Sequence, residues 1–410
     1  MSAIEKLISQ LCPEGVPYLA LGEVGEFFRG RRFVKDDIRG SGVPAIHYGE
    51  LYTKYSNVAY ETFSFLDKDL ASKLRVAKKG DVILVSAGET ISDIGKSIAW
   101  LGGADVVIHD ALYGYRSPLD AKYVSYFFNS ANFRMQLPKY INSSKVSAIS
   151  PSNLSKISIP VPPIEIQREV VQILDKFNEL EAELEAELEA RKTQFEFILD
   201  QVFDSEEIRK YGPTKLTDHG EFDRGNGLQK ADFSDHGVGC IHYGQIYTKF
   251  GSYAQDVYTF VPEVLAAKLK KVSQGNLVIT TTSENIQDVC KAVAWLGKNE
   301  IVIGGHSCVF RHDLDPLFAT YLFRSRLFQD QKNSYVQGTK VKDIKPAQIG
   351  KIEVYVPPMK KQIEIGLTMR NFDDLVQDVS VGLPAEISAR RQQYEYYRNK
   401  LLAFKALESS

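Results

Sequence analysis

The chain has 410 residues, of which 44% are hydrophobic and 25% are charged, and its formal net charge is −2. This length allows two or three domains with cores of their own, and no apolar run approaches the roughly 20 residues of a membrane-spanning helix. The N-terminal segment lacks the basic flank and long apolar core of a secretory signal, so we expect a cytoplasmic protein.

The sequence contains an internal duplication. IHYGELYTKY at 46–55 returns as IHYGQIYTKF at 241–250, with seven of the ten positions identical and His47 and His242 separated by 195 positions. The same spacing relates Trp100 to Trp295 and Arg29-Gly30 to Arg224-Gly225. Two copies with almost no insertions predict two similar domains related by an internal pseudo-twofold repeat.

The first part of each copy, at about 18–160 and 208–357, mixes short apolar runs with turn residues. The expected strands include 81–86 and 106–108 in the first copy and 276–281 and 300–303 in the second. Each copy also has one helical stretch, at 121–137 and 316–331. This pattern predicts a compact α+β domain in each copy.

A long helix follows each domain, directly after Pro162-Pro163 and Pro357-Pro358, because proline ends a strand ladder but is compatible with a helix start. Heptad spacing predicts that each helix pairs with a partner helix, and the simplest partner is the helix of the other copy. The expected pairing residues are Val170, Leu174, Phe177, Leu184 and Leu188 in the first helix, and Ile365, Met369, Phe372, Val376, Val379 and Leu383 in the second.

The two helices differ where the first contains a tetrapeptide repeat, LEAELEAELEAR, at 180–191. The alternative interpretation is plain helix-forming sequence, because Leu, Glu and Ala all favour helices. Beyond this repeat the spacing between the copies changes from 195 to 199, as Arg191 and Arg390 illustrate. Gly382 and Pro384 mark the extra turn, and we expect the second helix to kink or unwind there.

No catalytic motif is present in the sequence. Phosphate loops, GxGxxG, GxSxG and HExxH are missing, which argues against nucleotide hydrolysis or cofactor-bound methyl transfer by this chain alone. Cys240, Cys290 and Cys308 correspond to Ala45, Gly95 and Tyr113 in the first copy. We therefore expect buried free thiols and no metal site.

The repeated IHYG segment has side chains suited to nucleic acid. Tyr, Thr and Lys commonly contact phosphate, and His can address base edges. The candidates are His47, Tyr48, Tyr52, Thr53 and Lys54, with His242, Tyr243, Tyr247, Thr248 and Lys249 in the second copy. The alternative is that His47 and Tyr48 are interior polar residues near a strand end.

Fourteen acidic and six basic residues fall within 164–210, so the rest of the chain is net basic, as phosphate-binding domains would require.

Two further segments suit phosphate binding. The loop before each proline pair offers Ser143, Ser144 and Lys145 in the first copy and Gln337, Thr339 and Lys340 in the second; the alternative is a polar loop without a ligand. The basic start of each copy offers Arg29 with Lys35, and Arg224 with Lys230, whereas Arg31 and Arg32 become Asn226 and Gly227.

The chain resembles the specificity subunit of a type I restriction–modification system over essentially all of its length. The order of parts carries the resemblance: a domain with HYG[EQ][LI]YT, then VPP with Gln167 or Gln362, then a long helix, all occurring twice. The resemblance implies two target recognition domains (1–160, with a short N-terminal segment 1–17, and 208–357) and two conserved helices (161–207 and 358–405). It implies that the helices form an antiparallel coiled coil that acts as a spacer ruler.

The resemblance also implies a role and partners. The chain would bind an asymmetric, two-part site in double-stranded DNA without catalysing a reaction. It would dock methyltransferase subunits, expected as two, which supply S-adenosylmethionine and methylate adenine, and a restriction subunit that uses ATP and Mg.

Positions that differ between the copies are the expected places for base recognition, because residues common to both cannot distinguish two half-sites. These candidates are Glu50, Ser86 and His109, and in the second copy Gln245, Thr281 and His306. Two other functions stay open: a scaffold whose two domains grip a protein partner, and an enzyme with a site where the domains meet. A basic face would favour DNA, and a large apolar patch would favour protein.

Overall fold

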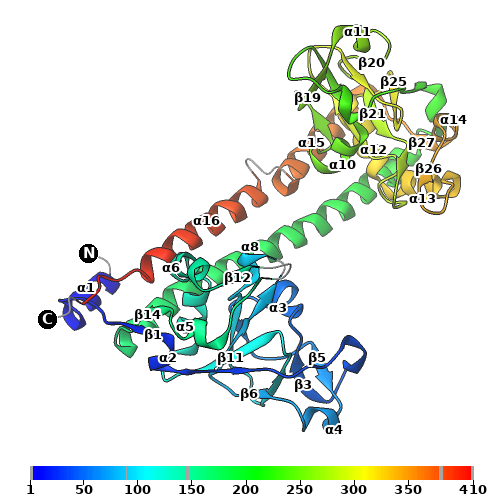
Figure 1. Ribbon diagram of the computed structural model, residues 1–410. Coiled ribbons are helices and arrows are strands. Elements are labelled where there is room, and N and C mark those ends of the chain that lie inside the picture. The colour runs from blue at the N-terminus through cyan, green and yellow to red at the C-terminus, as the bar shows by residue number, and fades with distance from the viewer. Residues whose placement is uncertain (1–2, 89, 144–146, 378–381, 408–410) are drawn as a thin grey trace. The chain divides into compact units, whose positions relative to one another are not determined.

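The computed structural model describes residues 3–88, 90–143, 147–377 and 382–407 (Figure 1). The chain divides into two compact units. Unit 1 comprises residues 1–182 and 389–410, and unit 2 comprises residues 183–388. Each unit contains one α+β domain together with parts of the long helices, so the expected fold class is confirmed. The division of the chain at residues 160, 207 and 357 stays a prediction.

Unit 1 is built on two mixed sheets. One has the strand order β2-β11-β7-β9-β4, with bounds β2 Glu26–Arg29, β11 Leu112–Arg116, β7 Val82–Val85, β9 Ser97–Trp100 and β4 Val58–Ala59. The other has the order β5-β3-β10-β6, with bounds β5 Ser64–Leu66, β3 Val43–Ile46, β10 Val106–Ile108 and β6 Val76–Ala77. Smaller sheets pair β1 (Tyr18–Ala20) with β14 (Ser158–Pro160), and join β12 (Asn142–Ser143), β13 (Ser147–Ala148) and β8 (Ala87–Gly88).

Unit 2 repeats this topology. Its sheets have the orders β16-β25-β21-β23-β18 and β19-β17-β24-β20. The bounds are β16 Gly220–Arg224, β25 Ser307–His312, β21 Leu277–Thr280, β23 Ala292–Trp295, β18 Tyr253–Ala254, β19 Thr259–Val261, β17 Val238–Ile241, β24 Ile301–Ile303 and β20 Lys270–Val272. The paired strands are β15 (Pro213–Lys215) with β27 (Glu353–Tyr355) and β22 (Thr282–Ser283) with β26 (Lys342–Asp343). The strands expected from the apolar runs are therefore confirmed.

The single helical stretch expected in each domain is two helices. Their bounds are α5 Ala121–Phe128 and α6 Ala131–Gln136 in unit 1, and α12 Pro316–Arg324 and α13 Arg326–Tyr335 in unit 2. The side chain of Ser130 accepts a hydrogen bond from the backbone N–H of Phe133, and Ser325 does the same for Phe328. Each serine is thus an N-cap that starts a new helix, and the apolar spacing alone did not reveal this break.

Shorter helices complete the domains. Unit 1 has α1 Ala3–Leu11, α2 Leu21–Val24, α3 Glu50–Thr53, α4 Lys68–Ala71 and α7 Pro151–Leu154, and unit 2 has α9 Glu206–Arg209, α10 Tyr243–Thr248, α11 Glu263–Ala266 and α14 Pro346–Ile349. The free thiols of Cys240, Cys290 and Cys308 are buried, as expected.

The long helices begin directly after the two proline pairs, as predicted. The first is α8 (Ile164–Phe203, 40 residues, drawn in green in Figure 1). The second proline pair precedes α15 (Met359–Gln377), and a separate helix α16 (Leu383–Leu401) follows. Residues 378–381 lie outside the described residues, and the predicted pairing residue Val379 is one of them. The kink expected at Gly382 and Pro384 adjoins this segment.

Helix pairing is visible in unit 1. The Phe177 ring of α8 stacks on Tyr397 of α16, with centroids 5.4 Å apart, and Glu181 accepts a 2.6 Å hydrogen bond from Arg391. Residue numbers rise along one helix as they fall along the other, so this contact is antiparallel. In unit 2, Phe195 and Leu199 of α8 share a core cluster with Ile365 and Met369 of α15.

The apolar face of the first helix has a second role that the heptad interpretation missed. Val170 and Leu174 are fully buried in the same cluster as Tyr123 and Phe127 of α5. They pack on the domain of unit 1 as well as on Tyr394 of α16. In α15 and α16, Val376 and Leu383 are buried and Phe372 is half-buried against the core, while Leu184 and Leu188 of α8 are half-buried.

Candidate DNA interface

The repeated IHYG segment forms the same turn in both units. β3 ends at Ile46 and α3 starts at Glu50, while β17 ends at Ile241 and α10 starts at Tyr243. The backbone N–H of His47 donates to Glu50 Oε2 at 2.8 Å, and that of His242 donates to Gln245 Oε1 at 3.0 Å. These bonds satisfy a backbone donor at the start of each short helix.

The histidine ring of each turn is fixed by its own backbone. His47 Nδ1 accepts from the N–H of Gly49 at 3.4 Å, and His242 Nδ1 accepts from the N–H of Gly244 at 3.2 Å. Since Nδ1 is an acceptor, the neutral ring carries its proton on Nε2. Burial is the main reason why the pKa of His47 and of His242 is lowered, so both rings are neutral near pH 7.

In unit 1, four rings gather around this turn. The Tyr48 ring lies 4.5 Å from His47 and 5.2 Å from His109, and the two histidine rings are 4.6 Å apart. The edge of Phe33 closes the group, 5.9 Å from His47 and 5.2 Å from His109. We call these four residues the unit 1 ring cluster. Only Tyr48 is substantially exposed, at 39%.

Unit 2 has a matching group. The Tyr243 ring lies 4.5 Å from His242 and 4.7 Å from His306, and Phe233 contacts His242 at 5.8 Å. We call these four residues the unit 2 ring cluster. His306 Nδ1 lies 2.9 Å from Thr282 Oγ1 on β22, which anchors this exposed ring. The clusters therefore combine the same residue types in both units.

The arginine-glycine pairs hold the loop that carries the second histidine. Arg29 Nε donates to the carbonyl of Asp110 at 2.9 Å, and Arg224 Nε donates to that of Gly305 at 3.3 Å. A Cβ on Gly30 would lie 2.1 Å from the His109 carbonyl oxygen, so only glycine allows this approach. The shared role of Arg29 and Arg224 thus includes supporting the loop, which the sequence did not indicate.

Several residues expected to recognise bases are instead engaged in the fold. Glu50 is 7% exposed and also accepts from Ser64 Oγ at 2.8 Å. In unit 2, Gln245 occupies the position equivalent to Glu50 and donates to Thr259 Oγ1 at 3.2 Å. Ser86 is buried and donates to the Ala111 carbonyl at 2.8 Å. These three side chains therefore already have hydrogen-bond partners within the fold, and their contact with bases stays a prediction.

Thr281, the unit 2 counterpart of Ser86, lies between β21 and β22 and is also enclosed. Its side chain is fully buried, and its Oγ1 has no hydrogen-bond partner among the described residues. A hydroxyl with this burial reaches a DNA groove only if the backbone between β21 and β22 rearranges. His109 is 9% exposed and His306 is exposed, so of the two second histidines only His306 is freely accessible.

The other candidates in the turn lie nearer the surface. Thr53, Lys54, Thr248 and Lys249 are exposed, and each lysine ammonium lies 5.0 Å above an exposed ring, Phe63 or Tyr258. Tyr52 and Tyr247 are half-buried. The Tyr247 hydroxyl donates to the Thr282 carbonyl at 2.5 Å, while the Tyr52 ring lies under the Lys96 ammonium at 4.6 Å.

The loop before the second proline pair lies beside the unit 2 ring cluster. β26 pairs Asp343 with Thr282, the residue that anchors His306. The backbones of Gln337 and Asp343 exchange hydrogen bonds, and Gln337, Thr339 and Lys340 are all exposed. In unit 1, β13 pairs with β8 in the same way, but Ser144 and Lys145 lie outside the described residues, as does the side chain of Ser143.

Exposed lysines flank both clusters. Lys35 and Lys230 are exposed, and each acts electrostatically on the nearby His47 or His242 to lower its pKa. Arg31 donates to the Lys73 carbonyl at 2.7 Å, and Asn226 donates to the Lys268 carbonyl at 2.8 Å. These two different residues therefore support the equivalent backbone carbonyl in each unit.

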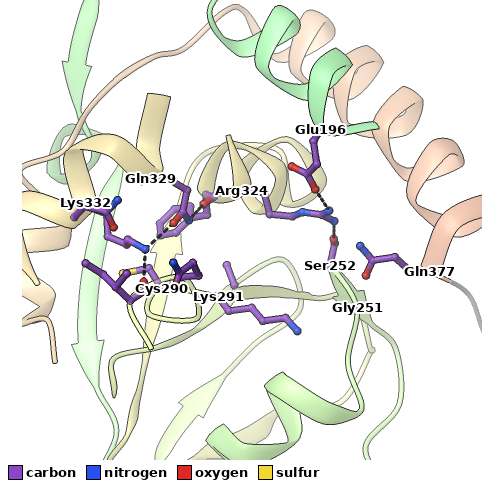
Figure 2. Close-up of a pocket in the computed structure, with 14 residues that line it drawn as sticks. Glu196, Gly251, Ser252, Cys290, Lys291, Arg324, Gln329, Lys332 and Gln377 are labelled. Atoms are coloured by element: carbon purple, nitrogen blue, oxygen red, sulfur yellow. Dashed lines mark hydrogen bonds and ion pairs between the residues drawn. The ribbon is translucent and has the colours of Figure 1, made fainter. Parts of the chain in front are cut away.

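A second polar group joins the unit 2 domain to its helices (Figure 2). Arg324 of α12 donates to Asp373 of α15 at 2.8 Å, to Ser252 at 2.9 Å and to Glu196 of α8 at 3.0 Å. The buried Lys332 donates to the Ile286 carbonyl and to Gln329 Oε1, both at 2.6 Å. Both cations line a cavity of about 500 Å³. The bonds of Arg324 join α12 to the two long helices, and those of Lys332 join α13 to the loop at Ile286.

Among the described residues, no group of three His, Cys, Asp or Glu side chains has the arrangement of a metal site. Within the same part of the chain, no helix combines the length and apolar character that crossing a bilayer requires.

Comparison with known proteins assigns the chain to a family. Residues 13–190 and 211–389 match the model of the type I restriction modification DNA specificity domain, so the chain belongs to this family. The type I restriction enzyme EcoR124I/EcoR124II specificity subunit of Escherichia coli is 26% identical over 426 residues, which cover 98% of this chain and 97% of that protein. A putative type I specificity subunit of Haemophilus influenzae is 23% identical over 341 residues, covering 80% and 83%.

A solved structure shares the fold. It concerns complex assembly and conformational transition of the type I restriction–modification system, and one chain of it aligns with a TM-score of 0.65 at 14% identity, covering 95% of this chain and 98% of that one. The resemblance drawn from the sequence is thereby confirmed.

The structure adds residues to the site that the sequence analysis did not single out. Phe33 and Phe233 each contact the first histidine, although they are not at corresponding positions of the duplication. A search for aromatic residues close to the turn, without requiring the 195-residue spacing, is the signal that would have found them.

Proposed function

We propose that this chain is the DNA-specificity subunit of a type I restriction–modification complex. Its two domains would each bind one half of an asymmetric, two-part site in double-stranded DNA. The observation that carries the proposal is the pair of matching ring clusters, each flanked by an exposed lysine and placed at the same turn of both domains. Family membership supplies the independent support.

The long helices would act as a spacer ruler and as a docking surface for partner subunits. One LEAE unit adds about 6 Å of helix, a little under two base-pair steps. Methyltransferase subunits, expected as two, would bind S-adenosylmethionine and methylate adenine, and a restriction subunit would use ATP and Mg. This chain would select the site in the cytoplasm without catalysing either reaction.

Mapping N6-methyladenine across the genome, with and without this gene, tests the proposal. We expect methylation at one two-part motif with a fixed gap to disappear when the gene is deleted. If the map is unchanged, co-purification of the chain with a co-encoded methyltransferase separates an inactive system from a wrong assignment. Absence of that partner as well would contradict the proposal.

A further inference from the structure

The exposed tyrosines of the two ring clusters offer hydrogen-bond donors that the fold does not use. No described residue forms a hydrogen bond with the hydroxyl of Tyr48 or of Tyr243. Both rings leave one side toward solvent, since Tyr48 is 39% exposed and Tyr243 is half-buried. A polar group held rigidly by buried neighbours but left without a partner is suited to a ligand.

The second histidine of each cluster comes from a different position of the same loop. His109 directly follows β10, whereas the residue at that position in unit 2 is Gly304, and His306 instead immediately precedes β25. Duplication alone would reproduce the histidine at the same position. A requirement for an imidazole beside the tyrosine accounts for its presence in both units.

The tyrosine and the first histidine of each cluster offer hydrogen-bond donors, and in unit 1 the half-buried Asp110 carboxylate lies 3.2 Å from His109 Nδ1. Nδ1 of His47 and of His242 is occupied by the turn, which leaves Nε2–H as a donor. The tyrosine hydroxyl and the ammonium of Lys35 or Lys230 add further donors. The carboxylate and amide that could have accepted from bases, Glu50 and Gln245, bond to the turn itself.

This balance of groups suits a phosphate better than a base edge. Phosphate oxygens only accept hydrogen bonds, whereas discrimination between base pairs in the major groove depends on a mixture of donors and acceptors. Residues common to both domains also cannot distinguish two different half-sites.

We propose that each ring cluster binds one backbone phosphate of DNA, at the equivalent point of each half-site, through Tyr48 or Tyr243 and the histidines beside it. The exposed His306 is then a phosphate-binding residue, whereas the buried His109, whose Nδ1 accepts from the Ala111 N–H at 3.1 Å, is a positioning residue. This inference rests on the proposed function. It leaves base recognition to segments that differ between the units.

The test removes only the hydroxyls. Tyr48→Phe and Tyr243→Phe, singly and together, are introduced into the full chain and purified with its partner subunits. Affinity is measured for two duplexes, one with the two-part motif from the methylation map and one with both half-sites scrambled. Tyr60→Phe and Tyr211→Phe are matched controls, because these tyrosines are 60% and 42% exposed and lie outside the clusters.

We expect each cluster variant to bind both duplexes about tenfold more weakly, since a hydrogen bond to a charged group contributes about 1.5 kcal/mol or more. The ratio of the two affinities and the methylated motif would stay unchanged. A motif that relaxes at one half-site, or a changed affinity ratio, would mean base recognition and would overturn the inference, as would unchanged affinity. Failure of the proposed function looks different, because the wild-type complex would then not prefer the motif duplex.

His306→Ala provides a second measurement at an exposed position where folding is not at risk. Weaker binding to both duplexes by the same factor supports the inference. A loss confined to the motif duplex contradicts it.

Discussion

Units 1 and 2 perform the same structural tasks with different residues. The polar contacts between domain and long helix use neutral residues at three positions of unit 1, where Asn129 donates to Asn57 at 3.0 Å and Asn178 donates to Tyr126 at 2.8 Å. The ion pair of unit 1 lies elsewhere, between Lys122 of α5 and Asp175 of α8. In unit 2 the corresponding positions carry Arg324, Ser252 and Asp373, which form a charged group. The ring clusters differ in the same way, because the second histidine enters from a different loop position. The geometry of the fold therefore constrains these sites more tightly than residue identity at each position does.

The two tryptophans allow the units to be compared directly. Trp100 and Trp295 are each 2% exposed, one in each unit. Replacing Trp100 by Phe leaves Trp295 as the fluorescence reporter of unit 2, and the converse variant reports unit 1. Denaturant unfolding followed in these two backgrounds provides a separate stability for each unit.

The largest effect is expected from breaking the charged contact of unit 2. Arg324→Asn leaves Asp373, which is 3% exposed, without its cation, and we expect unit 2 to lose about 3 kcal/mol. Unit 1 should be unaffected. Adding Ser252→Asn and Asp373→Asn supplies the neutral residues of unit 1 and should restore most of the loss. If the triple variant is as unstable as the single one, the two contacts are not interchangeable.

Acid sensitivity should differ between the units because of one histidine. Burial lowers the pKa of His312 from its usual 6.5 to about 4, whereas unit 1 has Ser117 at this position. Between these pH values the unfolded chain binds a proton and the folded chain does not. The stability contributed by the neutral ring is therefore complete above pH 6.5 and is lost as the pH falls to 4, by up to about 3 kcal/mol.

The measurement uses the Trp100→Phe protein, in which Trp295 reports unit 2, with and without His312→Ser. The free energy of unfolding of wild type should fall more steeply between pH 6.5 and 4 than that of the variant. Parallel curves for the two proteins would show that His312 is protonated equally in the folded and unfolded chain.

A smaller loss is expected at the capping carboxylate of unit 1. Glu50→Ala removes the acceptor for the His47 N–H and for Ser64, and we expect unit 1 to lose about 2 kcal/mol. Glu50→Gln should cost less than about 1 kcal/mol, because Gln245 performs this task in unit 2. Both are measured with Trp100 as the reporter. Equal losses for the two variants would show that the charge itself is needed in unit 1.

The smallest expected effect sharpens the comparison of the DNA-binding faces. Lys35→Ala and Lys230→Ala should each reduce the slope of log affinity against log salt by about 0.9, because one phosphate contact is lost. Lys6→Ala and Lys298→Ala, at other exposed positions, should leave the slope unchanged. Unequal changes at Lys35 and Lys230 would show that the two domains do not meet the DNA backbone in the same way.

The sequence by itself determined the duplication, the buried strands and the start of each long helix. The 195-residue spacing identifies equivalent positions without any structure, and the proline pairs mark the helix starts because their ring excludes a continuing strand ladder. The IHYG turn was also predictable as a repeated feature. Which of its side chains are exposed and which are buried was not predictable, since periodicity does not distinguish exposed Tyr48 from buried His47 and Glu50.

Only the tertiary structure decided which side chains gather at that turn. A fixed spacing finds residues that correspond in the chain, whereas His109 and His306 correspond only in space. Side chains from different positions of one loop can reach the same point, so their meeting depends on the path of the backbone. The same reasoning applies to Arg29 and Arg224, whose support of that loop arises from strand neighbours distant in sequence.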